Sequence, residues 1–139
     1  MFELHTRLEK DTVPIGDLAL CRVLLMNNAN YPWVILVPRR DDVAEIFQLT
    51  AQDQQQLMLE MSEVSSALAA HYRADKMNVA ALGNIVPQLH VHVIARYQDD
   101  AMWPRPVWGG AAREYTDDVL AATLSELREL LEIDGLDPA

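Results

Sequence analysis

The most informative stretch of this chain reads Gln88-Leu89-His90-Val91-His92-Val93-Ile94-Ala95-Arg96. Its odd-numbered residues are all apolar, whereas its even-numbered residues include two histidines, a glutamine and an arginine. Because successive side chains of a β-strand point to opposite faces, this alternation predicts a strand over about residues 88–97 whose odd-numbered side chains enter a core. The imidazoles of His90 and His92 then share the other face, about 6.5 to 7 Å apart along the strand, so both can flank one small group.

The residues before this strand predict a hairpin and a long helix. Apolar runs at 21–26 and 33–37 are separated and stopped by segments rich in Asn, Pro and Asp, which predicts two strands with a turn near residues 28–32. Thr50 begins a pattern that resembles a capping box, and apolar residues recur behind it at spacings of three and four. This spacing predicts a helix over residues 51–72.

The remaining residues complete a small α+β domain. We expect a strand at 77–82, a loop at 83–87 and, after an irregular segment that carries Trp103 and Trp108, a helix at about 116–132. The strands form an antiparallel meander, and two helices with one apolar face each cover one side of it. The other side of the sheet is left for a site or a partner.

Composition and charge restrict the function classes. The 139 residues predict a single domain over 1–139, and 50% of them are hydrophobic without a run long enough to span a membrane. A net charge of -10 disfavours contacts with polymeric nucleic acid and with anionic lipid surfaces, but a small anionic ligand is compatible with it. The start of the sequence resembles no secretory signal and Cys21 is the single cysteine, so we expect a cytoplasmic protein.

Three interpretations of the histidine pair are open at this stage. In the first, the two imidazoles are polar side chains on the wet face of an antiparallel sheet. In the second, His90 and His92 bind a metal ion; the spacing identifies no third ligand, although His5 and His71 are candidates. In the third, a neutral imidazole attacks phosphorus while the other imidazole and nearby backbone amides hold the phosphate oxygens.

The segment Gly83-Asn84-Ile85 just upstream is compatible with the third interpretation. Glycine permits close approach of a backbone to a ligand, and a neutral Asn can donate to a phosphate or a ribose without adding charge. An ordinary turn between two strands explains Gly83 and Asn84 equally well. The two histidines on one strand therefore carry more of the argument than this loop does.

The order of these segments resembles the histidine triad family. The family signature, His-φ-His-φ-His-φ-φ with φ apolar, is matched by Gln88-Leu89-His90-Val91-His92-Val93-Ile94, and residues 83–86 stand where the family often has Gly-Gln-Ser/Thr-Val. Upstream, Met26-Asn27 and Tyr31-Pro32-Trp33-Val34-Ile35-Leu36-Val37-Pro38 resemble the family's Asn, its turn and its Pro-Gly-His-x-Leu-Val-φ-Pro. The resemblance covers the core motif region, residues 21–97, and includes the long helix in its expected place.

The resemblance implies a five-stranded antiparallel sheet with two helices, a homodimer, and a nucleotide bound on the open face. Enzymes of the family hydrolyse or transfer nucleoside monophosphates through a nucleotidyl-histidine intermediate, attacking the α-phosphate of dinucleoside polyphosphates or phosphoramidates. By position, His90 matches the nucleophile and His92 the phosphate-binding histidine. No cofactor and no metal ion are implied. The family positions that contact ribose or phosphate are matched by Asn27, Asn78, Gly83 and Asn84.

Two departures from the family pattern stand at the site. Gln88 replaces the first histidine and cannot carry a proton at neutral pH, but its backbone carbonyl can accept from Nδ1 of His90 and leave Nε2 as the nucleophile. The loss of that proton carrier favours dinucleoside-polyphosphate-like substrates, whose leaving groups need less help. The alternative is a nucleotide-binding module with weak or no catalysis. Trp33 replaces another family histidine, and its ring either stacks on a base or fills the core.

Arg96, at the end of the histidine strand, is a candidate contact for a distal phosphate of the nucleotide. A solvated strand end is the alternative explanation of this arginine.

Overall fold

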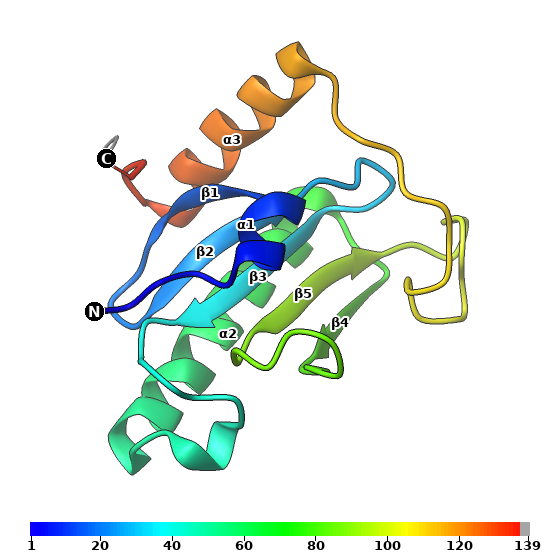
Figure 1. Cartoon of the computed structure of the whole chain (residues 1–139). Helices are drawn as coiled ribbons and strands as arrows, with labels where there is room; N and C mark the ends of the chain where they lie inside the picture. The colour runs from blue at the N-terminus through cyan, green and yellow to red at the C-terminus, as the bar shows by residue number, and fades with distance from the viewer. Residues whose placement is uncertain (137–139) are drawn as a thin grey trace.

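The computed structural model of the chain, which describes residues 1–136, contains a five-stranded antiparallel sheet in the order β1-β2-β3-β5-β4 (Figure 1). Its strands are β1 (Thr12–Asp17), β2 (Cys21–Met26), β3 (Trp33–Pro38), β4 (Lys76–Ala80) and β5 (Val91–Arg96). The helices are α1 (Thr6–Asp11), α2 (Ala51–Tyr72), α3 (Asp117–Leu131) and a short 3-10 helix, η1 (Ile46–Gln48). The predicted α+β architecture is confirmed, and the histidine strand β5 lies inside the sheet between β3 and β4.

Local signals explain why α2 begins and ends where the sequence predicts. The side chain of Thr50 accepts a hydrogen bond from the backbone N–H of Asp53 at 3.1 Å, which caps the helix before its first residue. Arg73 has a left-handed backbone with φ of 51°, and its N–H donates to the carbonyl of Ala69, which ends the helix. Within residues 1–136, no helix has both the length and the apolar content needed to cross a membrane.

Two elements near the N-terminus were not expected from the sequence. The helix α1 has six residues, too few for a hydrophobic period to be recognised. The strand β1 contains Pro14 and Gly16, which usually argue against a strand, and its register with β2 shifts between these two residues. Because β1 lies at the edge of the sheet, the missing N–H of Pro14 is tolerated there.

The larger core lies between the sheet and the helices α2 and α3, which pack behind the sheet in Figure 1. The odd-numbered residues of the histidine strand enter this core, as predicted, because they share the face of the sheet that the helices cover. The strands contribute Ile15, Val23, Leu25, Val34, Leu36, Val91 and Val93, and the helices contribute Leu57, Val64, Leu68 and Leu127.

The second face of the sheet is not open, which corrects the expectation that only one side is covered. A smaller core forms there because α1 and the loop after β5 lie across this face (Figure 1). Its buried residues are Leu8, Leu24, Tyr31, Trp33, Ile35, Val37, Val86, Ile94 and Val107. The strand β5 is consequently buried along its whole length, including its polar residues His92 and Arg96, and His90 just before the strand is buried as well.

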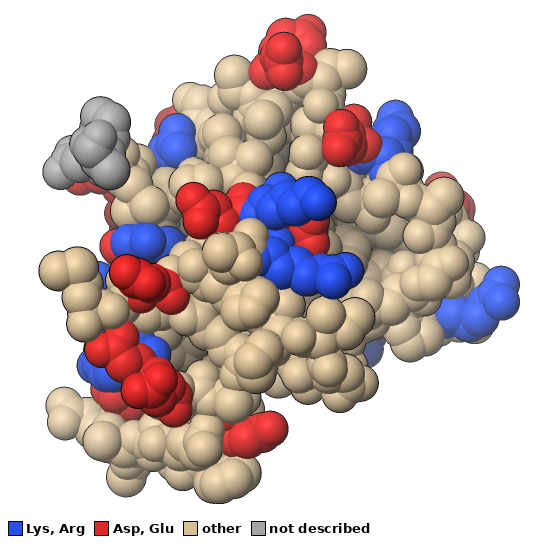
Figure 2. Space-filling model, in the orientation of Figure 1, with Lys and Arg blue, Asp and Glu red and all other residues tan. Residues whose placement is uncertain are grey.

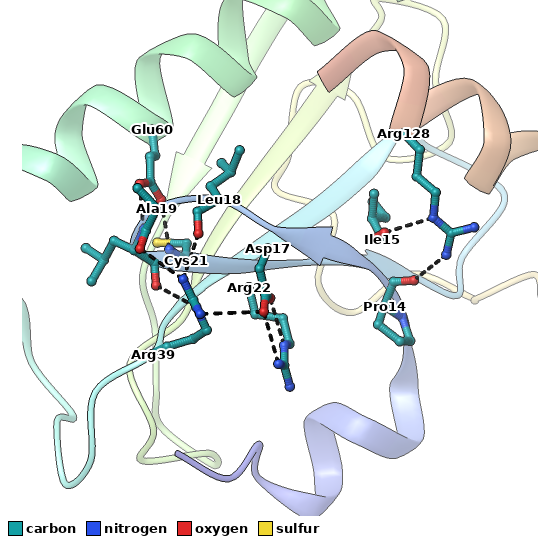
Figure 3. A network of polar contacts seen from close by, with 11 residues as sticks. Pro14, Ile15, Asp17, Leu18, Ala19, Cys21, Arg22, Arg39, Glu60 and Arg128 are labelled. Carbon is teal, nitrogen blue, oxygen red and sulfur yellow. Dashed lines mark hydrogen bonds and ion pairs between the residues drawn. The ribbon is translucent and has the colours of Figure 1, made fainter. Parts of the chain in front are cut away.

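A buried carboxylate joins α2 to the turn between β1 and β2 (Figure 3). Glu60 is 2% exposed, and its oxygens accept hydrogen bonds from the backbone N–H groups of Leu20 and Cys21 at 2.9 and 2.8 Å. Gln56, one helical turn earlier, donates a third hydrogen bond at 2.7 Å. On the same turn Arg39 donates to three backbone carbonyls. The polar groups of this buried turn are therefore satisfied by side chains from α2 and from the end of β3.

The end of α3 is held against β1. The guanidinium of Arg128 donates to the carbonyls of Ile15 and Pro14 at 2.8 and 3.1 Å (Figure 3). A Cβ atom on Gly16 would lie 2.2 Å from Ile133 Cγ2, so only glycine lets the segment after α3 approach the strand this closely.

We expect Glu60→Gln to lower the free energy of unfolding by about 1–3 kcal/mol, because the amide nitrogen cannot accept from a buried backbone N–H. Urea denaturation followed by circular dichroism measures the change. Glu63→Gln, on the exposed side of the same helix, is the control and should change stability by no more than about 0.5 kcal/mol. Equal effects of the two substitutions would contradict the role given to Glu60.

Candidate active site

His90 lies just before β5 and is held by the backbone of the preceding loop. Its imidazole is 7% exposed, and Nδ1 lies 2.7 Å from the carbonyl oxygen of Gln88. A carbonyl can only accept, so Nδ1 carries the proton and Nε2 keeps its lone pair. The contact that was expected from the sequence is present, and it leaves Nε2 of His90 with its lone pair.

His92 has the opposite arrangement. Its imidazole is 5% exposed, and Nδ1 accepts a hydrogen bond from the indole N–H of Trp33 at 3.0 Å. The remaining proton of the neutral ring therefore lies on Nε2, which becomes a hydrogen-bond donor. Burial, followed by the proximity of His90, lowers the pKa of His92 to about 4, so the ring is neutral at physiological pH.

The two imidazoles are close together and differ in which ring nitrogen carries the proton. Their ring centroids are 5.0 Å apart at an interplanar angle of 70°. Trp108, from the loop after β5, packs edge-on against His92 at 5.0 Å and against Trp33 at 5.8 Å, and it is 37% exposed. One face of the sheet thus presents a lone pair from His90 and an N–H from His92 beside an accessible aromatic ring.

Two pockets of about 390 Å³ each flank the histidines. The first is lined by His90, Gly83 and Gln88, together with apolar residues of η1 and of the loop after β4. The second is lined by Asn27, Trp33 and Trp108, together with the end of α1. A third and larger pocket, about 660 Å³, lies on the far side of Gln88. Glu3, Asp41 and Asp42 line it, whereas Glu45 lines the first pocket and Asp11 and Glu114 line the second, so the third pocket carries the most carboxylates and is the least favourable for a phosphate.

Few basic side chains lie near the histidines. Lys10 is the one basic residue among those that line the first two pockets. On the face that carries α1, basic and acidic side chains lie next to one another near the middle, with mostly uncharged surface below them (Figure 2). A phosphate bound here must therefore be held mainly by neutral N–H groups.

The predicted ribose contact, Asn27, lies at the wall of the second pocket. Its side-chain oxygen accepts from the backbone N–H of Tyr115 at 3.0 Å, and its amide nitrogen has no hydrogen bond to another described residue. Gly83 lines the first pocket with a φ of 75°, a left-handed conformation that favours glycine, and the exposed Asn84 follows it. Asn27 therefore lies on one side of the histidine pair, and Gly83 and Asn84 lie on the other.

Arg96 and Asn78 lie elsewhere in the structure. Arg96 is 1% exposed, and its guanidinium donates to both carboxylate oxygens of Asp100, to Oδ1 of Asn78 and to the carbonyl of Arg105. These hydrogen bonds hold the pKa of Asp100 at about 2, so the pair is charged. Since the donors of Arg96 serve the protein itself, we assign Arg96 and Asn78 to the fold in place of the expected phosphate and nucleotide contacts.

The structure gives Trp33 a function that the sequence did not reveal. Of the two expectations for its ring, filling the core agrees with its burial among Leu8, Ile35 and Ile94. Its hydrogen bond to His92 was missed, because it depends on the pairing of β3 with β5. Asp100 was also missed; three backbone N–H groups, of Tyr97, Met102 and Trp103, donate to it and shape the loop that carries Trp108.

The residues considered as further metal ligands are used in other ways. His5 caps α1 by accepting from the N–H of Arg7 through Nδ1 at 3.1 Å, and His71 pairs with Glu126 of α3. Over residues 1–136, no cluster of three or more His, Cys, Asp or Glu side chains is placed to hold a metal ion. His90 and His92 therefore have no third ligand within this part of the chain.

Comparisons with known proteins agree with the fold. A family model described as HIT domain matches residues 7–99. A histidine triad protein from Bradyrhizobium japonicum is 51% identical, with a TM-score of 0.90 over 94% of this chain and 98% of that one. A histidine triad protein from Marinobacter aquaeolei VT8 is 50% identical, with a TM-score of 0.92 over 95% of this chain and 97% of that one.

A curated relative matches over a shorter region. The bis(5'-adenosyl)-triphosphatase of Saccharomyces cerevisiae is 33% identical over 70 residues, which make up 47% of this chain. The match covers 34% of the yeast protein, so most of that protein has no counterpart in the alignment.

Replacing Trp33 by Phe should raise the pKa of His92 above its native value of about 4, because Nδ1 can then take up a proton without facing the indole N–H. Titration of the histidine ring signals by NMR measures this pKa. Trp103→Phe, which changes a tryptophan that makes no hydrogen bond to His92, is the matched control. A pKa of His92 that is the same in wild type and Trp33→Phe would contradict the assignment.

Proposed function

The chain belongs to the HIT domain family, and we propose that it is a nucleotide hydrolase or nucleotidyltransferase that attacks the α-phosphate of a nucleoside phosphate conjugate. The observation that carries the proposal is the pair of imidazoles with opposite tautomers, one with a free lone pair at Nε2 and one with a proton there. A phosphoryl group needs both, a nucleophile at phosphorus and a donor to its non-bridging oxygens.

In the proposed first step, the lone pair of His90 Nε2 forms a bond to the α-phosphorus as the bond to the leaving-group oxygen or nitrogen breaks, and the leaving atom takes that electron pair. His92 donates from Nε2 to a non-bridging oxygen and remains neutral because of its low pKa. The carbonyl of Gln88 accepts from Nδ1 of His90 and supports the positive charge that the ring acquires. In the second step, the oxygen of water or of another acceptor forms a bond to phosphorus and gives its proton to solvent, while the bond from phosphorus to Nε2 breaks and its electron pair returns to His90. Water gives the free nucleoside monophosphate, and another acceptor takes up the nucleotidyl group.

The substrate preference follows from the missing acid. Gln88 cannot deliver a proton, so a leaving group that is stable as an anion, such as a nucleoside polyphosphate, reacts more readily than an alkoxide or an amine anion. The partial similarity to the yeast bis(5'-adenosyl)-triphosphatase supports dinucleoside polyphosphates as the first substrates to test. Because Lys10 is the one basic residue in the two flanking pockets, we expect the distal phosphates to extend into solvent.

The nucleoside half fits best in the pocket lined by Asn27 and Trp108. The amide nitrogen of Asn27, which has no hydrogen bond to another described residue, can donate to a ribose hydroxyl, and the accessible ring of Trp108 can contact a base. The pocket lined by Gly83 and Gln88 then lies beside the first phosphate of the leaving group, whose outer phosphates extend past it into solvent.

A nucleotide-binding module with weak or no catalysis is the second candidate. It is favoured by one observation: the amide of Gln88 is occupied on both its nitrogen and its oxygen by backbone groups of the N-terminal segment, so nothing at this position can assist the leaving group. The two candidates differ in whether a covalent intermediate forms.

We also propose that the protein is a homodimer and acts in the cytoplasm. The strand β4 lies at an edge of the sheet, and its outer backbone groups have no strand partner within the described chain. Val79 on this strand and Leu82 and Ile85 after it are exposed apolar side chains. An unpaired apolar edge favours association with a second copy.

Rapid mixing of the protein with diadenosine polyphosphate or a nucleoside phosphoramidate, followed by acid quench and intact mass spectrometry, tests covalent catalysis. We expect one added nucleoside monophosphate in wild type and none in His90→Ala, with turnover of that variant at the background rate. His71→Ala, an exposed histidine far along α2, is the control and should form the adduct normally. Nucleotide binding by wild type with neither adduct nor turnover would favour the binding module.

Light scattering at micromolar concentration tests the dimer. We expect about twice the chain mass of 15.7 kDa. Val79→Lys should shift the protein towards the monomer, since it places a charge on the exposed edge. A wild-type protein that scatters as a monomer over the whole concentration range rules out the proposed association.

A further inference from the structure

The side chain of Gln88 holds the N-terminal segment of the protein. Its Nε2 donates to the carbonyl of Glu3 at 2.9 Å, and its Oε1 accepts from the backbone N–H of His5 at 2.8 Å. Both ends of the amide are thus occupied by one short stretch of backbone, more than 80 residues away in sequence. Neither contact involves an atom of the two imidazoles.

This pair of contacts suits an amide and does not suit an imidazole. A primary amide carries a donor and an acceptor next to each other on one planar group. Glu3 and His5 flank a single residue and present a carbonyl and an N–H to that group. A neutral imidazole also has one donor and one acceptor, but they lie on different edges of the ring and diverge, so histidine at this position could satisfy one of the two backbone groups.

The two hydrogen bonds of the Gln88 amide lie in a segment that does not pair with a neighbouring strand. The ladder of β5 begins at Val91, so the backbone of residues 88–90 has no strand partner. Two contacts fix it instead, the side-chain amide of Gln88 and the hydrogen bond from the N–H of Leu89 to the carbonyl of Val43 at 2.9 Å. The carbonyl of the same Gln88 holds Nδ1 of His90 at 2.7 Å.

The segment that Gln88 holds forms part of the site's surroundings. Phe2 and Leu4 pack against the smaller core, and His5 caps α1. The last residues of α1, Lys10 and Asp11, line the pocket that also contains Asn27. The position of Gln88 is therefore linked both to the tautomer of His90 and to the helix at the edge of the opposite pocket.

We propose that Gln88 is a positioning residue, whose side-chain amide binds the backbone of Glu3 and His5 and thereby holds the carbonyl that orients the nucleophilic imidazole of His90. This inference rests on the proposed function for its kinetic consequences, whereas its structural content is independent of turnover. The substitution Gln88→His, which introduces the residue typical of the family, then removes a required hydrogen bond and does not raise kcat.

Two measurements on the folded wild-type protein test the contacts directly. Hydrogen exchange followed by NMR should find the amide of His5 protected, because it donates to Gln88 Oε1. Nitrogen-15 shifts of the imidazoles should assign the proton of His90 to Nδ1. An unprotected His5 amide, or a His90 proton on Nε2, overturns the proposal whether or not the protein turns over a nucleotide.

Three variants test whether Gln88 positions His90 or only stands where a catalytic histidine is absent. Gln88→Leu loses both contacts and should expose the His5 amide, Gln88→Glu keeps an acceptor for the His5 N–H but loses the donor to the Glu3 carbonyl, and Gln88→His keeps at most one contact. Each variant should allow both tautomers of His90. In the steady state, kcat should fall by about 10- to 100-fold, with KM changed less than about threefold, since the nucleophile and not the nucleotide pocket is affected. Gln55→Glu, on an exposed turn of α2, is the matched control for the added charge.

The outcomes divide clearly. A rise in kcat for Gln88→His, or a His90 tautomer unchanged in all three variants, overturns the proposal. If Gln88→His does not fold, Gln88→Glu, which keeps the shape of the side chain, and the wild-type exchange data decide the question. A wild type that forms no nucleotide adduct contradicts the proposed function alone, because the exchange and nitrogen-15 measurements still judge the role of Gln88.

Discussion

Burial of two imidazoles on one strand is the constraint on which the site depends. A buried ring nitrogen without a partner costs free energy, about 1–3 kcal/mol for a neutral group, so each Nδ1 must find one. The protein supplies a carbonyl to His90 and an indole N–H to His92. Since an acceptor and a donor select opposite tautomers, the two Nε2 atoms differ: Nε2 of His90 keeps its lone pair, and Nε2 of His92 carries the proton.

The groups that bind Nδ1 of His90 and Nδ1 of His92 are held in place by the two hydrophobic cores on either side of β5. On one side the larger core fixes the strand against α2 and α3. On the other, pairing of β3 with β5 brings Trp33 beside His92, and the ion pair of Arg96 with Asp100 shapes the loop that lays Trp108 against the same ring. The smaller core therefore does more than stabilise the sheet, because it sets the protonation of the histidine that it covers.

Most of the fold could be predicted from patterns within single segments of the sequence. Contacts between distant segments could not be predicted in this way. The alternation in β5 and the capping residue of α2 are local, and both elements were found with their correct faces or ends. The strand β1 was missed because Pro14 and Gly16 are tolerated only at an edge, which the sequence does not reveal. At the site, the His90 contact spans two residues and was expected, while the Trp33 contact spans 59 and was not. The burial of Arg96 depends on Asp100, whose position is likewise set by the folded loop.

The two departures from the family pattern have a common physical effect. Gln88 and Trp33 both stand where the family often has an imidazole, and both donate hydrogen bonds without titrating near neutral pH. His92 is also kept neutral by burial. In the proposed function, a phosphate is therefore stabilised by oriented N–H groups in a low-dielectric environment, which do not need to be protonated before each turnover. The same proposal implies little long-range attraction for polyanions, and it assigns selectivity to the fit of a nucleotide around the two imidazoles.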